Sequence, residues 1–139
     1  MYIDLEYYQN IYGEIDPFLF DEVCFEAQAK LDNATTSILG VKRLKEFFPT
    51  DKDDAERVKR CLAKIVNVMV DARETKEDLY KNGAITGMNS GSESISYNPS
   101  LIINEVSEQQ LNRDIRSIIR DYLGGVTDVN GIGLLYGGY

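Results

Sequence analysis

Histidine and tryptophan are absent from the 139 residues, and cysteine and proline are scarce, with two and three copies. Histidine is the side chain that most often acts as a general base near neutral pH, so acid–base catalysis would need a carboxylate or lysine with a shifted pKa. Two cysteines without histidine cannot complete a zinc shell of the usual kind. No catalytic constellation emerges from the sequence, and we expect a protein that is not an enzyme and uses no metal or cofactor.

Long apolar runs and an excess of basic residues are also missing. No stretch of about eighteen apolar residues could span a membrane, and MYIDLEYY lacks the basic start and apolar core of a signal peptide. The 23 acidic and 15 basic residues give a net charge of −8, which disfavours tight nonspecific binding to nucleic acid. We expect a soluble intracellular protein with a single domain over residues 1–139.

Helix caps are clear in the first part of the chain. Asp4 precedes LEYYQNIY and can accept hydrogen bonds from the first helical amides, while Gly13 suits the end of this short helix. Asp16 is a second cap, and Pro17 takes a position where its missing amide costs nothing. Apolar residues then recur at steps of three and four as far as Ala34, which predicts an amphipathic helix.

Two further helices follow before residue 83. VKRLKEFF predicts a short one that ends before Pro49, and the acidic stretch TDKDDAE opens a long one from Asp51 to Asn82. Cys24 and Cys61 fall on the apolar faces of two predicted helices. We therefore expect both thiols to be reduced and buried in the core.

The last predicted helix runs from near Ser107 to Leu123, and Ser107 with Gln110 resembles a capping box. Three arginines line the side opposite its apolar residues. Two roles fit this pattern: a solvated face with little effect on stability, or a contact with the acidic flank of an adjacent subunit. The three residues are Arg113, Arg116 and Arg120.

The segment before this helix breaks the helical period and is rich in glycine, serine and asparagine. Within it, SESISYN alternates polar and apolar side chains and places Ile95 and Tyr97 on one face. Two states fit: a short strand or hairpin arm that pairs with neighbouring backbone, or a disordered surface loop. In the first state, Ile95 and Tyr97 would bind a partner.

The sequence ends in GGVTDVNGIGLLYGGY, residues 124–139, which contains six glycines. Ordering such a segment has a large entropic cost, which contacts with another surface must offset. Its natural anchors are Leu134, Leu135, Tyr136 and Tyr139. Two arrangements fit: a flexible docking arm that binds a neighbouring subunit, or a segment that folds back on its own domain and closes a gap between helices.

These patterns together predict a mainly α-helical fold. We expect a small bundle of about four to five helices, with a helical core formed by residues 1–82 and 107–123. Residues 83–106 would form the loop or short strand segment, and residues 124–139 the C-terminal docking arm.

Five segments in order resemble the head-tail connector family of tailed double-stranded DNA bacteriophages, whose members are also encoded by prophages. They are the opening MYIDLEYYQNIYG, the amphipathic helices, SESISYN, IIRDYLGG and the closing GIGLLYGGY. Tyr7, Tyr8 and Tyr12 match the family's aromatic opening, Ser94–Tyr97 its extended segment, and Leu134–Tyr136 its closing motif. Members commonly carry a basic residue after the closing tyrosine, where this chain has Gly137, which weakens the case for a charged contact there.

The resemblance implies a structural adaptor, or head completion protein, that assembles as a ring on the phage portal and continues the DNA channel toward the tail. Implied partners are the portal protein, neighbouring copies of the chain and a tail-side completion or stopper protein. DNA would pass through the channel without specific binding, and no membrane is involved. The protein would lie at the head–tail junction of the virion, and in the bacterial cytoplasm before assembly. The alternative is a small intracellular helical regulatory module that binds one host protein in a groove.

Overall fold

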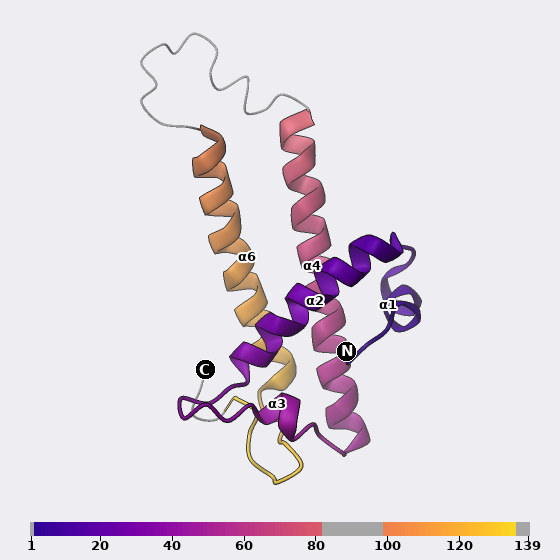
Figure 1. Ribbon diagram of the computed structural model, residues 1–139, viewed down its shortest axis with the longest axis vertical. Coiled ribbons are helices and arrows are strands. Elements are labelled where there is room, and N and C mark those ends of the chain that lie inside the picture. Colours follow the sequence, from indigo (N-terminus) through magenta and orange to yellow (C-terminus); the bar gives the residue numbers. More distant parts are fainter. Residues whose placement is uncertain (1, 82–98, 136–139) are drawn as a thin grey trace.

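The computed structural model describes the backbone of residues 2–81 and 99–135, and the side chains of residues 2–74 and 108–135. The described residues form five helices, which confirms the predicted mainly α-helical bundle (Figure 1). None of these helices, over the residues described, has the length and hydropathy needed to cross a membrane. They are α1 (Leu5–Tyr12), α2 (Pro17–Ala34), α3 (Arg43–Glu46), α4 (Lys52–Lys81) and α6 (Pro99–Leu123).

The first two helices begin where the caps predicted. The Asp4 carboxylate accepts a hydrogen bond from the Tyr7 amide at 2.8 Å, and the Asp16 carboxylate accepts one from the Phe18 amide at 3.1 Å. Each bond satisfies an amide that has no partner inside the helix. Gly13 ends α1 with its φ at +94°. These local signals fix both helix starts.

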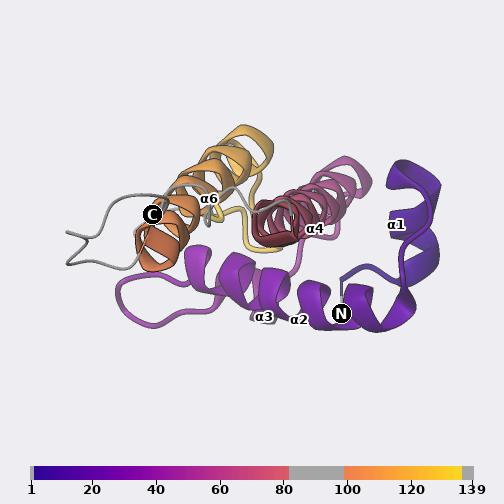
Figure 2. The ribbon, with the colours of Figure 1, turned by 90° about the horizontal axis from the view of Figure 1, so that it is seen from above.

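Helices α4 and α6 pack side by side and run in opposite directions, and α2 crosses them (Figures 1 and 2). One cluster of buried side chains joins the three helices, with α1 packed against its edge. Cys24 and Cys61 lie in this cluster, fully buried and unpaired, which confirms the prediction of two core thiols. The largest fully buried side chains are Phe20, Leu31, Leu44, Leu62, Ile65, Ile119, Leu123 and Leu134.

Two predicted boundaries were wrong. Helix α6 begins at Pro99 rather than near Ser107, so residues 99–106 are helical and Ser107 lies inside the helix instead of capping it. Proline suits the first helical position because its missing amide would have no partner there, and Pro99 is the stronger start signal. The third helix is also shorter than expected and spans only Arg43–Glu46. The predicted strand around residues 94–97 lies outside the described residues.

The C-terminal tail differs from the predicted docking arm. Residues 124–135 do not extend away from the domain. They fold back on it, with Val126 and Leu134 buried in the core and Leu135 packed against it. The Leu134 amide donates a hydrogen bond to the Val126 carbonyl at 3.0 Å and closes this segment on itself. Burial of these side chains offsets the entropy that the glycines lose, so the fold-back alternative applies to residues 124–135.

Candidate functional site

A tight turn follows α2 at residues 36–42, which we call the first turn. Thr36 and Lys42 form an isolated antiparallel bridge across its base. The Gly40 amide donates a hydrogen bond to the Ser37 carbonyl at 2.9 Å, and the Val41 amide donates one to Ser37 Oγ at 3.1 Å. The Ser37 amide in turn donates to the Val41 carbonyl at 2.9 Å. Both the backbone and the Ser37 side chain therefore hold the turn closed.

A second turn follows α6 at residues 127–133. Thr127 and Gly133 form the antiparallel bridge at its base. The Gly131 amide donates to the Asp128 carbonyl at 3.0 Å, the Ile132 amide donates to Asp128 Oδ1 at 3.1 Å, and the Asp128 amide donates to the Ile132 carbonyl at 2.8 Å. Each bond matches one in the first turn, with Asp128 in the place of Ser37.

The same turn is thus built twice from related sequences, TSILGV at residues 36–41 and TDVNGI at residues 127–132. In both, a threonine precedes a Ser or Asp acceptor, and a glycine follows two central residues. Gly40 and Gly131 have φ values of +84° and +81°, a region that favours glycine over residues with a side chain. Figure 1 shows both turns at one end of the bundle, the end opposite residues 81 and 99.

Apolar side chains are exposed on both turns. Ile38 and Leu39, the central pair of the first turn, are 87% and 91% exposed, and Val129 and Ile132 of the second turn are 50% and 39% exposed. The second turn is also anchored to the residue that follows α3, because the Val129 amide donates a hydrogen bond to the Phe47 carbonyl at 3.2 Å. This end of the molecule, the turn end, therefore presents apolar groups on two closed turns.

Asp128 carries one oxygen more than the turn uses. Its Oδ1 accepts hydrogen bonds from the Asn130 and Ile132 amides, whereas Oδ2 is buried and has no hydrogen-bond partner among the described residues. Ser37 closes the first turn with a single acceptor oxygen. The second carboxylate oxygen of Asp128 is therefore a cost to stability that the turn geometry does not require.

A second exposed apolar surface lies on α2. Phe18 and Phe25 are 84% and 72% exposed, on the side of the helix opposite the buried Phe20, Val23 and Ala27. Seven residues separate the two rings, so both fall on one stripe of the helix. Asp21 and Glu22 lie between them and are exposed. We call these four residues the aromatic face of α2.

The two acids of the aromatic face differ in their partners. Arg73 of α4 forms an ion pair with Glu22 at 3.5 Å and another with Glu26 at 3.2 Å. Asp21 forms no ion pair with any described residue. The aromatic face therefore keeps one carboxylate, that of Asp21, with no ion-pair partner among the described residues.

The three predicted arginines are all exposed on α6, whereas Ile115 and Ile119 of the same helix are buried in the core. Arg116 lies at the edge of the groove that Ile115 and Ile119 form with α2. None of the three arginines forms an ion pair within the described part of the chain. Asp114 and Asp121 follow two of the arginines in sequence and point to a different flank, since successive residues lie about 100° apart around a helix. We call Arg113, Arg116 and Arg120 the arginine face of α6.

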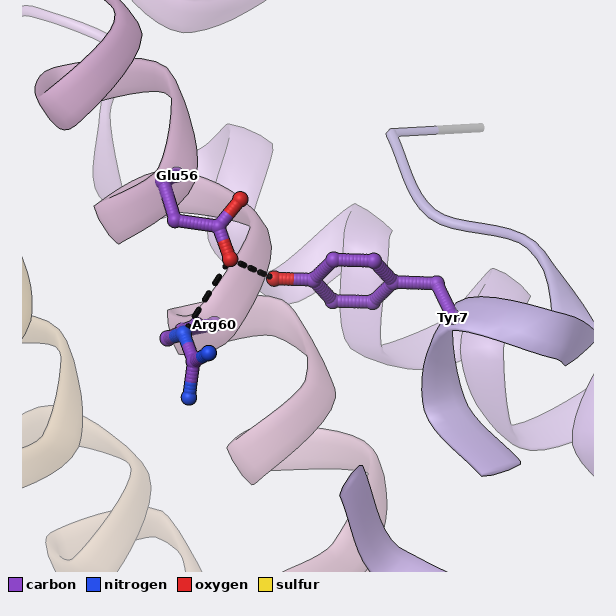
Figure 3. Close-up of polar contacts among 3 residues, drawn as sticks. All are labelled: Tyr7, Glu56 and Arg60. Carbon is purple, nitrogen blue, oxygen red and sulfur yellow. Dashed lines mark hydrogen bonds and ion pairs between the residues drawn. The ribbon is translucent and has the colours of Figure 1, made fainter. Parts of the chain in front are cut away.

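The tyrosines at the start of the chain hold α1 against the bundle. The Tyr7 hydroxyl donates a hydrogen bond to Glu56 Oε1 of α4 at 2.8 Å, and Arg60 Nε donates to the same oxygen at 3.1 Å (Figure 3). Burial and the hydrogen bond to Glu56 raise the pKa of Tyr7 above its ordinary value. The Tyr2 hydroxyl donates in the same way to Asp32 of α2, and burial likewise raises its pKa. These rings therefore have a structural role.

Among the described residues, the buried thiols, the possible metal ligands and the cavity form no reactive site. Burial raises the pKa of Cys24 to about 11 and that of Cys61 to about 12, so both thiols stay protonated near neutral pH. Over the described residues, no three potential metal ligands gather in one place. A cavity of about 340 Å³ lies between α2, α4 and α6, and its charged wall includes the Arg73–Glu26 ion pair. The surfaces of the molecule, rather than its interior, carry the candidate site.

The residues predicted to bind partners are not all exposed in the structure. Leu134 is 1% exposed and belongs to the core, and Leu135 is half-buried against it, so neither extends toward a partner. The arginine face is exposed as expected. Outside the described residues lie Ile95, Tyr97, Tyr136 and Tyr139.

Sequence reasoning missed the aromatic face and the turn end. The signal for the first was present, because Phe18 and Phe25 stand seven residues apart and off the apolar stripe that Phe20 and Val23 define. The signal for the second was the repeat of TSILGV as TDVNGI. Neither pattern follows the apolar stripes that predict the helical core.

Comparison with known proteins adds no relative: no family model, curated protein or solved structure matches this chain.

Proposed function

We propose that this chain is a structural head-tail connector subunit that assembles as a ring on the portal of a tailed phage or prophage. The observation that carries the proposal is the exposure of large apolar side chains on two separate surfaces, the aromatic face and the turn end. Exposed apolar groups gathered in this way mark protein–protein contacts more often than isolated ones do. The resemblance of five ordered segments to the connector family supplies the identity of the partner.

The two surfaces suit the two kinds of contact that a ring subunit makes. A ring requires lateral contacts between copies and a further contact at one end with the component on which it stacks. The turn end presents Ile38, Leu39 and Val129 from closed turns, so little conformational entropy is lost when they are buried. In this proposal, the turn end contacts the portal or the tail-side protein.

The charge of the chain is compatible with a channel for DNA. A net charge of −8 repels the phosphate backbone, and an acidic lining keeps a duplex from adhering as it passes. Two features support a structural role over catalysis: both described thiols are protonated and buried, and the hydroxyls of Tyr2 and Tyr7 are engaged in hydrogen bonds to helices.

The test is binding to the cognate portal, measured by sedimentation of the mixed proteins. We expect the wild-type chain to co-sediment with the portal. The double variant Leu39→Asp with Val129→Asp should no longer bind it. Asn10→Asp with Gln109→Glu is the matched control, because it also adds two negative charges, at exposed positions of α1 and α6. Binding that survives the two turn substitutions would remove the turn end from the proposal.

The competing function is the regulatory module. A chain that stays monomeric and ignores the portal would favour it, and so would a gene that lies away from capsid and tail genes. The connector proposal requires the gene to lie between them.

A further inference from the structure

We propose that copies of this chain associate head to tail, with the aromatic face of α2 on one copy against the arginine face of α6 on the next. This inference deepens the proposed assembly and rests on it for the ring, but the contact itself follows from the described side chains. The occupant of each surface is a second copy of this chain. Three observations support this contact: the opposite charges of the two faces, the equal spacing of their side chains along the two helices, and the absence of an ion pair at Asp21 among the described residues.

Charge excludes the symmetric alternatives. Two aromatic faces that met each other would bring Asp21 and Glu22 against their own copies, and two arginine faces would bring three cations against three. Like charges in contact are destabilising, whereas the mixed pairing puts each sign against its opposite. The contact is therefore heterologous, which generates a ring when its rotation closes and a chain of subunits when it does not.

Spacing matches along the two helices. Phe18 and Phe25 are seven residues apart, and so are Arg113 and Arg120, which at 1.5 Å per residue is about 10.5 Å on each helix. A guanidinium group packs favourably over the face of an aromatic ring. Both rings can therefore meet an arginine at the same time.

The residues between the two aromatic rings determine whether the two helices run parallel or antiparallel in the contact. Arg116 lies three residues after Arg113, and Asp21 lies three residues after Phe18. In a parallel register, Phe18 meets Arg113 and Phe25 meets Arg120, which brings Asp21 to Arg116. The antiparallel register would instead bring Glu22 to Arg116, but Glu22 is already held by Arg73 in its own chain. Because Asp21 has no ion pair among the described residues, the parallel register adds a pair without breaking one.

Figure 2 shows that α2 and α6 form different sides of the bundle. The aromatic face lies on the side of α2 away from the core, and the arginines are exposed on α6, with Arg116 beside the groove between α6 and the C-terminal end of α2. A copy can therefore use both faces at once, as assembly beyond a dimer requires.

Cysteine crosslinking tests the register even when association is weak. Phe25→Cys with Arg120→Cys in one chain is treated with a short bismaleimide, at high protein concentration and on the portal. Cys24 and Cys61 are buried and protonated, so the native protein adds no reactive thiol. The matched control is Phe25→Cys with Asp121→Cys, which moves the second cysteine to another flank of α6.

We expect a ladder of dimers, trimers and higher species from the Phe25/Arg120 variant, and dimers at most from the control or from either single cysteine. A charge exchange adds an independent measurement. Asp21→Arg and Arg116→Asp should each abolish the association of otherwise native chains, and the double exchange should restore it. Equal ladders in test and control variants, or a double exchange that restores nothing, would overturn the inference.

The outcomes separate this contact from the proposed function. Portal binding without a specific ladder would leave the connector proposal standing and remove the α2–α6 contact. A specific ladder without portal binding would keep the contact and remove the connector proposal.

Discussion

Replacement of Leu134 by alanine should destabilise the protein strongly. Leu134 is 1% exposed and packs in the core with Val126, although it belongs to a tail in which six of sixteen residues are glycine. Truncation of a buried leucine costs about 2–5 kcal/mol, because transfer free energy is lost and a cavity remains. We expect a loss of about 3 kcal/mol, a large share of the roughly 5–15 kcal/mol that stabilises a typical domain.

The assay is urea denaturation followed by circular dichroism at the helical band. With a slope of about 1–3 kcal/mol per molar urea, a loss of this size lowers the unfolding midpoint by about 1 M or more. Ile132→Ala is the control, because Ile132 lies in the same tail but is 39% exposed, and its midpoint should change much less. An unchanged midpoint for Leu134→Ala would refute the packing of the tail on its own domain and restore the docking arm.

Three smaller predictions follow from local geometry. Gly40→Ala and Gly131→Ala should each cost about 1–2 kcal/mol in urea denaturation through backbone strain alone, since a methyl group would meet nothing within 4 Å at either position. Cys24 and Cys61 should not react with a thiol reagent in the native protein between pH 7 and 9, values well below their pKa of about 11 and about 12, and should react once urea unfolds it. Because the folded pKa of Tyr7 is raised, its contribution to stability should be complete below pH 10, where the unfolded side chain is protonated, and decline at higher pH. Thermal unfolding of Tyr7→Phe should show a weaker decline above pH 10, and an identical decline would contradict the raised pKa of the Tyr7 hydroxyl.

Capping chemistry explains why the first helices were predictable. Asp4 and the pair Asp16–Pro17 act within one turn of the chain, and the structure uses them where the sequence places them. The start of α6 was missed because two signals competed, the Ser107 pattern and Pro99, and the sequence does not say which prevails. Local capping signals therefore predict that a helix forms, but they do not decide which of two candidate residues begins it.

The tail and the interaction surfaces required the third dimension. Glycine content indicated freedom at residues 124–135, but the burial of Leu134 depends on a cluster whose members come from segments far apart in the sequence. The aromatic face could have been found from the seven-residue spacing of Phe18 and Phe25. Its match to the arginine face required knowledge of which carboxylate Arg73 already occupies.

Assembly on the portal is the central claim, and negative-stain microscopy with light scattering tests it most directly. The protein is measured over a concentration series, alone and with the cognate portal. The account predicts a monomeric or weakly associated chain by itself and a ring of subunits seated on the portal in the mixture. A monomer at every concentration that leaves the portal bare would contradict it.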